Sequence, residues 1–119
     1  MIIESFLEDL GVNEEEIVSL ENGFDALEYI RNNGADIVFS DINMPKMDGY
    51  EFASSLFKIR KDLQNSFFAI SGDETRESYR KMKKIGVHRF LKKPIESDHF
   101  NHFLIPEINK RRAMEELLL

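Results

Sequence analysis

Three reactive polar side chains follow short apolar runs in this sequence. Asp41 comes directly after IVFS, Ser71 ends the run FFAIS, and Lys93 follows RFLK. A carboxylate, a hydroxyl and an ammonium in one place suit the transfer of a phosphoryl group onto the carboxylate. Asp41 would be the nucleophile; Lys93 would neutralise charge on the transferred group, and Ser71 would hydrogen-bond one of its oxygens. A divalent cation is usually needed as well, because it shields the developing charge.

Each of these residues also has a simpler structural interpretation. Asp41 could cap the loop that follows it. Serine is common at strand ends and helix starts, so Ser71 could be an ordinary residue of that kind. Lys93 follows Lys92 and could be a solvated surface lysine. Each signal is therefore weak alone, and the chemical interpretation depends on the fold bringing the three side chains together.

The hydrophobic pattern predicts a fold that does so. Apolar β-type runs predict strands at residues 17–20, 36–40, 66–71 and 87–91. Helical spacing predicts helices over residues 2–10 and 22–33, from Asp48, from Gly72 to Ile85, and from Ser97, with Pro106 kinking or splitting the last one. Strands that alternate with helices indicate a parallel sheet. Function collects at the carboxyl ends of such strands, so the three polar side chains are expected to converge on one crevice.

Length and composition narrow the class of protein. The 119 residues suit one domain, and the net charge of −6 argues mildly against direct nucleic-acid binding. The chain has no cysteine, which excludes a disulfide framework and a cysteine-based zinc site. No run approaches 18 apolar residues and no signal-peptide pattern opens the chain. A cytoplasmic protein without membrane contact is the default expectation.

Three segments carry a family resemblance. DINMPKMDG, ISGDE and FLKKPI are similar to the motifs of the response-regulator receiver (CheY-like) domain of two-component signalling. The resemblance covers about residues 1–110 and leaves 111–119 as a helical tail, so we expect a single receiver-like domain over 1–119. It implies an α/β fold, the flavodoxin-like doubly wound parallel sheet.

The resemblance also implies a role for each site residue. Asp41 would be the phosphoacceptor, Ser71 the switch hydroxyl, Lys93 the neutralising cation and Phe90 the switch aromatic. Mg²⁺ would be held by Asp41 and the backbone carbonyl of Asn43. A histidine kinase or a phosphotransfer protein would be the partner, and the domain would be a switch and not an enzyme.

One part of the family pattern is missing. Receiver domains normally open with a central strand that ends in two acidic residues, which help to hold magnesium. Here MIIESFLEDLG resembles the family's first helix, and no such strand precedes it. Mg²⁺ binding is therefore expected to be weak. Three explanations stay open: a truncated start, a degenerate receiver that exchanges elements with a second copy, or filling of the slot by Leu117–Leu119.

The missing strand leaves an alternative function open. The chain could be a degenerate receiver that acts as a phosphorylation-independent interaction or dimerisation module. In either case we expect a homo-oligomer, with element swapping about Pro106 as one route. A hydrolase of the haloacid-dehalogenase type would need a second aspartate where this chain has Asn43, so that interpretation is set aside.

Overall fold

The computed structural model describes residues 2–43, 47–72 and 75–118. The chain divides into two compact units, which we describe separately: Met1–Val18 with Pro94–Leu119, and Ser19–Lys93. Met44, Pro45 and Lys46 of the DINMPKMDG segment lie outside the described residues, as do Asp73 and Glu74 of ISGDE.

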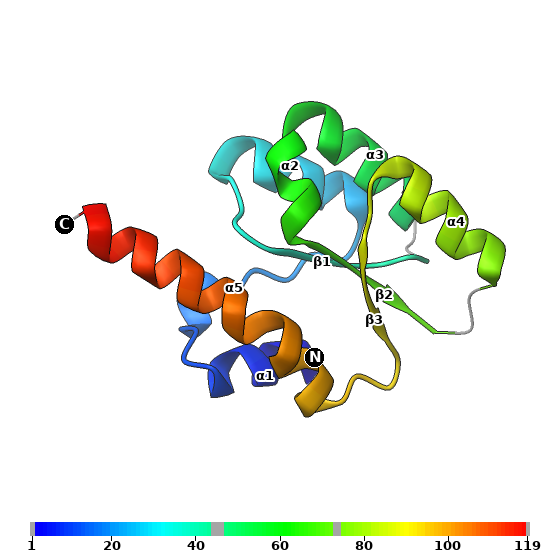
Figure 1. Ribbon diagram of the computed structural model, residues 1–119. Coiled ribbons are helices and arrows are strands. Elements are labelled where there is room, and N and C mark those ends of the chain that lie inside the picture. Colours follow the sequence, from blue (N-terminus) through cyan, green and yellow to red (C-terminus); the bar gives the residue numbers. More distant parts are fainter. Residues whose placement is uncertain (1, 44–46, 73–74, 119) are drawn as a thin grey trace. The chain divides into compact units, whose positions relative to one another are not determined.

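The unit Ser19–Lys93 is a parallel sheet whose strands are connected along the chain by helices (Figure 1). Its elements are α2 (Gly23–Asn33), β1 (Val38–Asp41), α3 (Gly49–Ile59), the 3₁₀ helix η2 (Lys61–Ser66), β2 (Phe67–Ser71), α4 (Arg76–Ile85) and β3 (Arg89–Lys92). Among the described residues the strand order is β1-β2-β3, and both pairings are parallel. The predicted α/β architecture is confirmed.

Side-chain caps fix where three of these helices begin. Asn22 accepts a hydrogen bond from the Asp25 N–H, and Asp48 accepts one from the Glu51 N–H at 2.9 Å. Such caps satisfy backbone donors that have no partner inside the helix. The sequence predicted both of these starts. It placed the start of α4 too early, because the cap there is Thr75.

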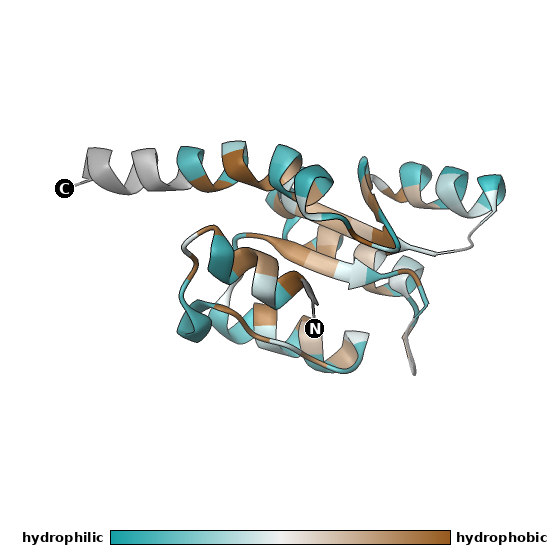
Figure 2. Cartoon of the chain, turned by 90° about the horizontal axis from the view of Figure 1, so that it is seen from below, coloured by the Kyte–Doolittle hydropathy of each residue, from teal (hydrophilic) through white to brown (hydrophobic). Residues whose placement is uncertain are grey.

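The core of this unit lies between the sheet and its helices. Side chains alternate between the two faces of a strand, and Phe67 and Ala69 of β2 belong to the same buried cluster as Phe52 and Leu56 of α3 and Met82 of α4. In Figure 2 the strands are mostly brown, whereas much of α4 is teal. The helices therefore cover an apolar sheet and present polar faces outward.

The other unit is built from helices. It contains α1 (Ile2–Asp9), the 3₁₀ helix η1 (Glu14–Glu16) and α5 (Ser97–Leu118). Within it the rings of Phe6 and Phe100 lie 5.3 Å apart between centroids. The predicted helix over residues 2–10 is thus confirmed, ending one residue early.

The prediction for the last helix was partly wrong. α5 is one helix that continues through Pro106 and is not split there (Figure 1). Proline removes one backbone donor, and the helix continues past that position. The sequence favours Ser97 as the cap of this helix, but Ser97 is already its first helical residue, because the Phe100 N–H donates to the carbonyl of Glu96.

The predicted strand at residues 17–20 is also wrong. These residues have no regular structure, and Val18 and Leu20 are 48% and 42% exposed. An isolated strand is unstable, because its backbone groups need a neighbouring strand. In the fold that the resemblance implies, that neighbour is the first strand, and no described residues supply it.

Candidate phosphoacceptor site

The carboxyl ends of the three strands meet at one edge of the sheet. Asp41 is the last residue of β1 and pairs in register with Ile70. Ser71 is the last residue of β2 and pairs with Lys92. The Lys93 N–H donates to the Ser71 carbonyl at 2.7 Å, which extends the β2–β3 ladder by one bond. The three residues that the sequence singled out therefore share this edge.

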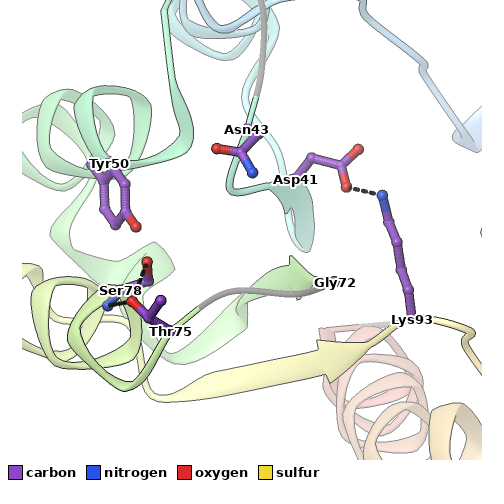
Figure 3. Close-up of a pocket in the computed structure, with 7 residues that line it drawn as sticks. All are labelled: Asp41, Asn43, Tyr50, Gly72, Thr75, Ser78 and Lys93. Carbon is purple, nitrogen blue, oxygen red and sulfur yellow. Dashed lines mark hydrogen bonds and ion pairs between the residues drawn. The ribbon is translucent and has the colours of Figure 1, made fainter.

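Asp41 and Lys93 form an ion pair there. The Lys93 Nζ lies 2.8 Å from Asp41 Oδ1, and the two side chains point toward one another (Figure 3). Since β2 separates β1 from β3, the long lysine side chain spans the end of the middle strand. The lysine and aspartate side chains are 55% and 31% exposed. A pair this exposed contributes only about 0–1 kcal/mol to folding, so stability alone does not explain it.

The pair borders an open hollow of about 460 Å³. The residues around it come from the ends of β1 and β2, from the segment after β3 and from the starts of α3 and α4. They are Asp41, Asn43, Tyr50, Gly72, Thr75, Ser78 and Lys93 (Figure 3). This volume admits a phosphoryl-sized group beside the Asp41 carboxylate. The sequence did not single out Tyr50, Thr75 or Ser78. Their positions at the starts of the helices that follow β1 and β2 were the available signal.

Gly49 lets α3 begin directly against the acceptor strand. Its N–H donates to the Ile42 carbonyl at 2.7 Å. A Cβ at this position would lie 2.6 Å from the Asp41 carbonyl oxygen and 2.7 Å from the Ile42 Cα. These are backbone atoms that cannot move aside as a flexible side chain can. Asp48 therefore caps α3, and Gly49 allows the start of this helix to lie against the backbone of Asp41 and Ile42.

Ser71 and Phe90 are connected through a third residue that the sequence did not single out. Ser71 is fully buried, and its Oγ lies 2.8 Å from the hydroxyl of Tyr79 on α4. The Tyr79 ring meets the Phe90 ring edge to face, with centroids 5.1 Å apart. Ser71 is not among the residues that line the hollow. Tyr79, Met82 and Ile85 have the spacing of an apolar helical stripe, and only the fold shows what the Tyr79 hydroxyl contacts.

The residues proposed to hold magnesium supply few ligands. Asp41 and Asn43 both line the hollow. Among the side chains that the structure describes, no group of three His, Cys, Asp or Glu residues could hold a metal ion. Mg²⁺ commonly binds through one or two carboxylates and keeps several waters. A single carboxylate and one carbonyl fit a weakly held ion.

The fold and the site together define the class of protein: a flavodoxin-like α/β domain that presents a carboxylate and a lysine at the carboxyl edge of its sheet. A family profile described as the response regulator receiver domain matches residues 1–104. The chain belongs to this family.

Curated relatives are longer proteins that contain a similar segment. The chain is 30% identical over 100 residues to the sensor histidine kinase CheAY of Helicobacter pylori, which covers 82% of the chain and 12% of that protein. It is 30% identical over 95 residues to the sensor histidine kinase RcsC of Salmonella typhi, covering 77% of the chain and 10% of that protein. The chain thus spans about a tenth of the length of these relatives.

Solved structures agree on the fold. A putative response regulator from Chloroflexus aurantiacus has a TM-score of 0.78 at 19% identity, covering 91% of this chain and 86% of that one. The receiver domain of NtrX from Brucella abortus has a TM-score of 0.77 at 21% identity, covering 91% of this chain and 88% of that one.

No helix among the described residues is both long and apolar enough to cross a membrane.

Proposed function

We propose that this chain is the phosphoryl-accepting receiver domain of a two-component system and that Asp41 is the acceptor. The observation that carries the proposal is the Asp41–Lys93 ion pair of 2.8 Å at the edge of an open hollow. The family match over residues 1–104 runs through both compact units, which supports one receiver-like domain over 1–119. The proposal includes a cytoplasmic location and no direct contact with nucleic acid.

The donor would be a phosphohistidine on a histidine kinase or a phosphotransfer protein. An Asp41 carboxylate oxygen attacks the phosphorus, an acyl–phosphate bond forms, and the phosphorus–nitrogen bond of the donor breaks. The histidine nitrogen leaves with the electron pair and takes up a proton. The Lys93 ammonium then pairs with the phosphoryl group, which carries a charge of about −2 where the free carboxylate carried −1. Asp41 needs no activation for this step, because its carboxylate is already the nucleophile.

Ser71 and Phe90 would change their positions when Asp41 is phosphorylated. In this proposal the Ser71 hydroxyl donates to a phosphoryl oxygen, and Phe90 repacks when the serine moves. Asp41 and the Asn43 carbonyl would hold Mg²⁺, which shields charge on the phosphoryl group when it is bound. The small ligand set at this edge favours weak binding of the ion.

The test is phosphorylation of the purified chain. We expect acetyl phosphate to add one phosphoryl group, detected by intact mass. We expect the labelling to be slow, to rise with magnesium up to high concentrations, and to stop when a chelator is added. Magnesium dependence without saturation would reflect the small ligand set. If no label appears at any magnesium concentration, with either acetyl phosphate or a phosphorylated kinase domain as the donor, the proposal is wrong.

A second candidate function is favoured by the same shortage of ligands. Since no described group of three acidic or histidine residues could hold a metal, the fold could act as a phosphorylation-independent interaction module. This degenerate receiver would bind its partner equally well before and after Asp41 is replaced. The labelling experiment separates the two candidates.

We also propose that the chain self-associates. Three large apolar side chains near the start of the sheet-containing unit are exposed: Val18 at 48%, Leu20 at 42% and Phe24 at 54%. Burying each would contribute roughly 1.5–3 kcal/mol, and β1 pairs with only one strand among the described residues. We expect light scattering coupled to size exclusion to give a dimer or larger mass at micromolar concentration. A sharp monomeric mass would contradict this.

A further inference from the structure

Tyr79 links the two residues that are proposed to report phosphorylation. Its hydroxyl lies 2.8 Å from Ser71 Oγ, and its ring meets the Phe90 ring at an interplanar angle of 70°. Ser71 stands at the end of β2, Phe90 in β3 and Tyr79 in α4. One side chain on a helix therefore contacts both candidate switch residues through different atoms.

The Ser71 hydroxyl has a strong reason to keep its partner. Ser71 is 0% exposed, so water does not replace a lost hydrogen bond, and a buried hydroxyl without a partner is costly. Tyr79 is only half-buried. Its hydroxyl can turn to solvent when the serine leaves. The hydrogen bond thus matters more to Ser71 than to Tyr79.

Ser71 cannot keep this contact and also serve the phosphoryl group. The Ser71 Oγ is fully buried and bonded to Tyr79 of α4, whereas a phosphoryl group would sit on the partly exposed Asp41 carboxylate at the end of the neighbouring strand. We therefore expect the hydroxyl to turn in order to reach a group bound there. Serine side chains occupy separate staggered positions, and passing from one to another carries the oxygen about 2 Å. That displacement breaks a hydrogen bond of ordinary length.

We propose that Tyr79 is a positioning residue that holds the Ser71 hydroxyl away from the acceptor site until the phosphoryl group arrives. The inference rests on the proposed function and adds a residue of α4 to it. Phosphorylation then exchanges the Ser71–Tyr79 bond for a Ser71–phosphoryl bond. The freed Tyr79 alters its packing on Phe90, which couples α4 to the end of β3.

The decisive variant is Tyr79→Phe, which keeps the ring against Phe90 and removes the competing hydroxyl. The probe is beryllium fluoride with magnesium, which forms a tetrahedral adduct on a carboxylate and so imitates a phosphoryl group at equilibrium. Fluorine NMR measures how tightly the adduct forms on Asp41. Since a single net hydrogen bond is removed from the free state only, we expect the adduct to form about three- to tenfold more tightly.

Two further proteins make the result specific. Tyr29→Phe removes a hydroxyl from a tyrosine on α2, outside the site, and should leave adduct affinity unchanged. In a Ser71→Ala background, adding Tyr79→Phe should have no effect, because there is no serine hydroxyl left to hold. A purely structural role for Tyr79 would lower the melting temperature in both backgrounds without this dependence on Ser71.

The outcomes separate the two levels of the proposal. Adduct formation by the wild-type chain with unchanged or weaker affinity in Tyr79→Phe overturns the inference and leaves the proposed function standing. A gain that persists in the Ser71→Ala background also overturns it, since the tyrosine would then act through packing alone. A wild-type chain that forms no adduct and accepts no phosphoryl group defeats the proposed function, and the inference with it.

Discussion

Replacing Asp41 by asparagine should abolish phosphoryl labelling while leaving the fold intact. Asparagine has nearly the shape of aspartate but carries no carboxylate nucleophile. The Asp41–Lys93 ion pair is exposed, so its loss should change stability by only about 0–1 kcal/mol. The measurement is intact mass after incubation with acetyl phosphate and magnesium, with circular dichroism to show that the variant is folded.

Asp48→Asn is the matched control. Asp48 is a neighbouring carboxylate that caps α3, and asparagine caps helices about as well as aspartate. This variant should therefore label as the wild type does. Persistent label in Asp41→Asn would mean that another side chain accepts the phosphoryl group, and equal loss in both variants would point to a general effect of charge near the hollow.

Gly49→Ala should be strongly destabilising. The new Cβ would lie 2.6 Å from the Asp41 carbonyl oxygen and 2.8 Å from that of Ile42. Alanine is otherwise the better helix former, by at most about 1 kcal/mol. Crowding against a fixed backbone costs about 1–3 kcal/mol or more. The clash therefore outweighs the gain in helix propensity, and the net change in stability is a loss. We expect the thermal midpoint of unfolding, measured by circular dichroism, to fall by about 5–15 °C.

Gly23→Ala tests whether the clash with backbone is the cause. Gly23 also begins a helix, α2, but its added Cβ would meet the Met47 side chain at 3.0 Å. A methionine side chain is flexible and can move aside, so this change should cost much less. An equal fall of the thermal midpoint in the two variants would show that any side chain at a helix start is harmful. An unchanged midpoint in Gly49→Ala would contradict the close approach of Gly49 to the Asp41–Ile42 backbone.

Local patterns determined most of the secondary structure. The starts of α2 and α3 could be predicted because Asn22 and Asp48 are cap residues that precede periodic apolar stripes. The buried strands could be predicted because continuous apolar runs suit a sheet covered on both faces. The position of Asp41 and Lys93 at one edge followed from parallel topology, and the structure adds that they touch.

Other features depended on residues far apart in the chain. Residues 17–20 have a strand-like composition but form no strand, because pairing requires a neighbour that no described residues provide. Tyr79 has the spacing of a core residue, and only the packing of α4 against the sheet brings its hydroxyl to Ser71. Gly49 is one of six glycines in the sequence, and the path of the Asp41–Ile42 backbone leaves no room for a Cβ at its position.

The division has a physical cause. Caps, periodicity and apolar runs act over a few neighbouring residues, so the sequence by itself determined the helix starts, the buried strands and the edge at which Asp41 and Lys93 end. Strand partners, the direction of a buried hydroxyl and the clearance around a glycine are set by atoms that are distant in sequence. Only the tertiary structure decided that Ser71 bonds to Tyr79 while Lys93 bonds to Asp41.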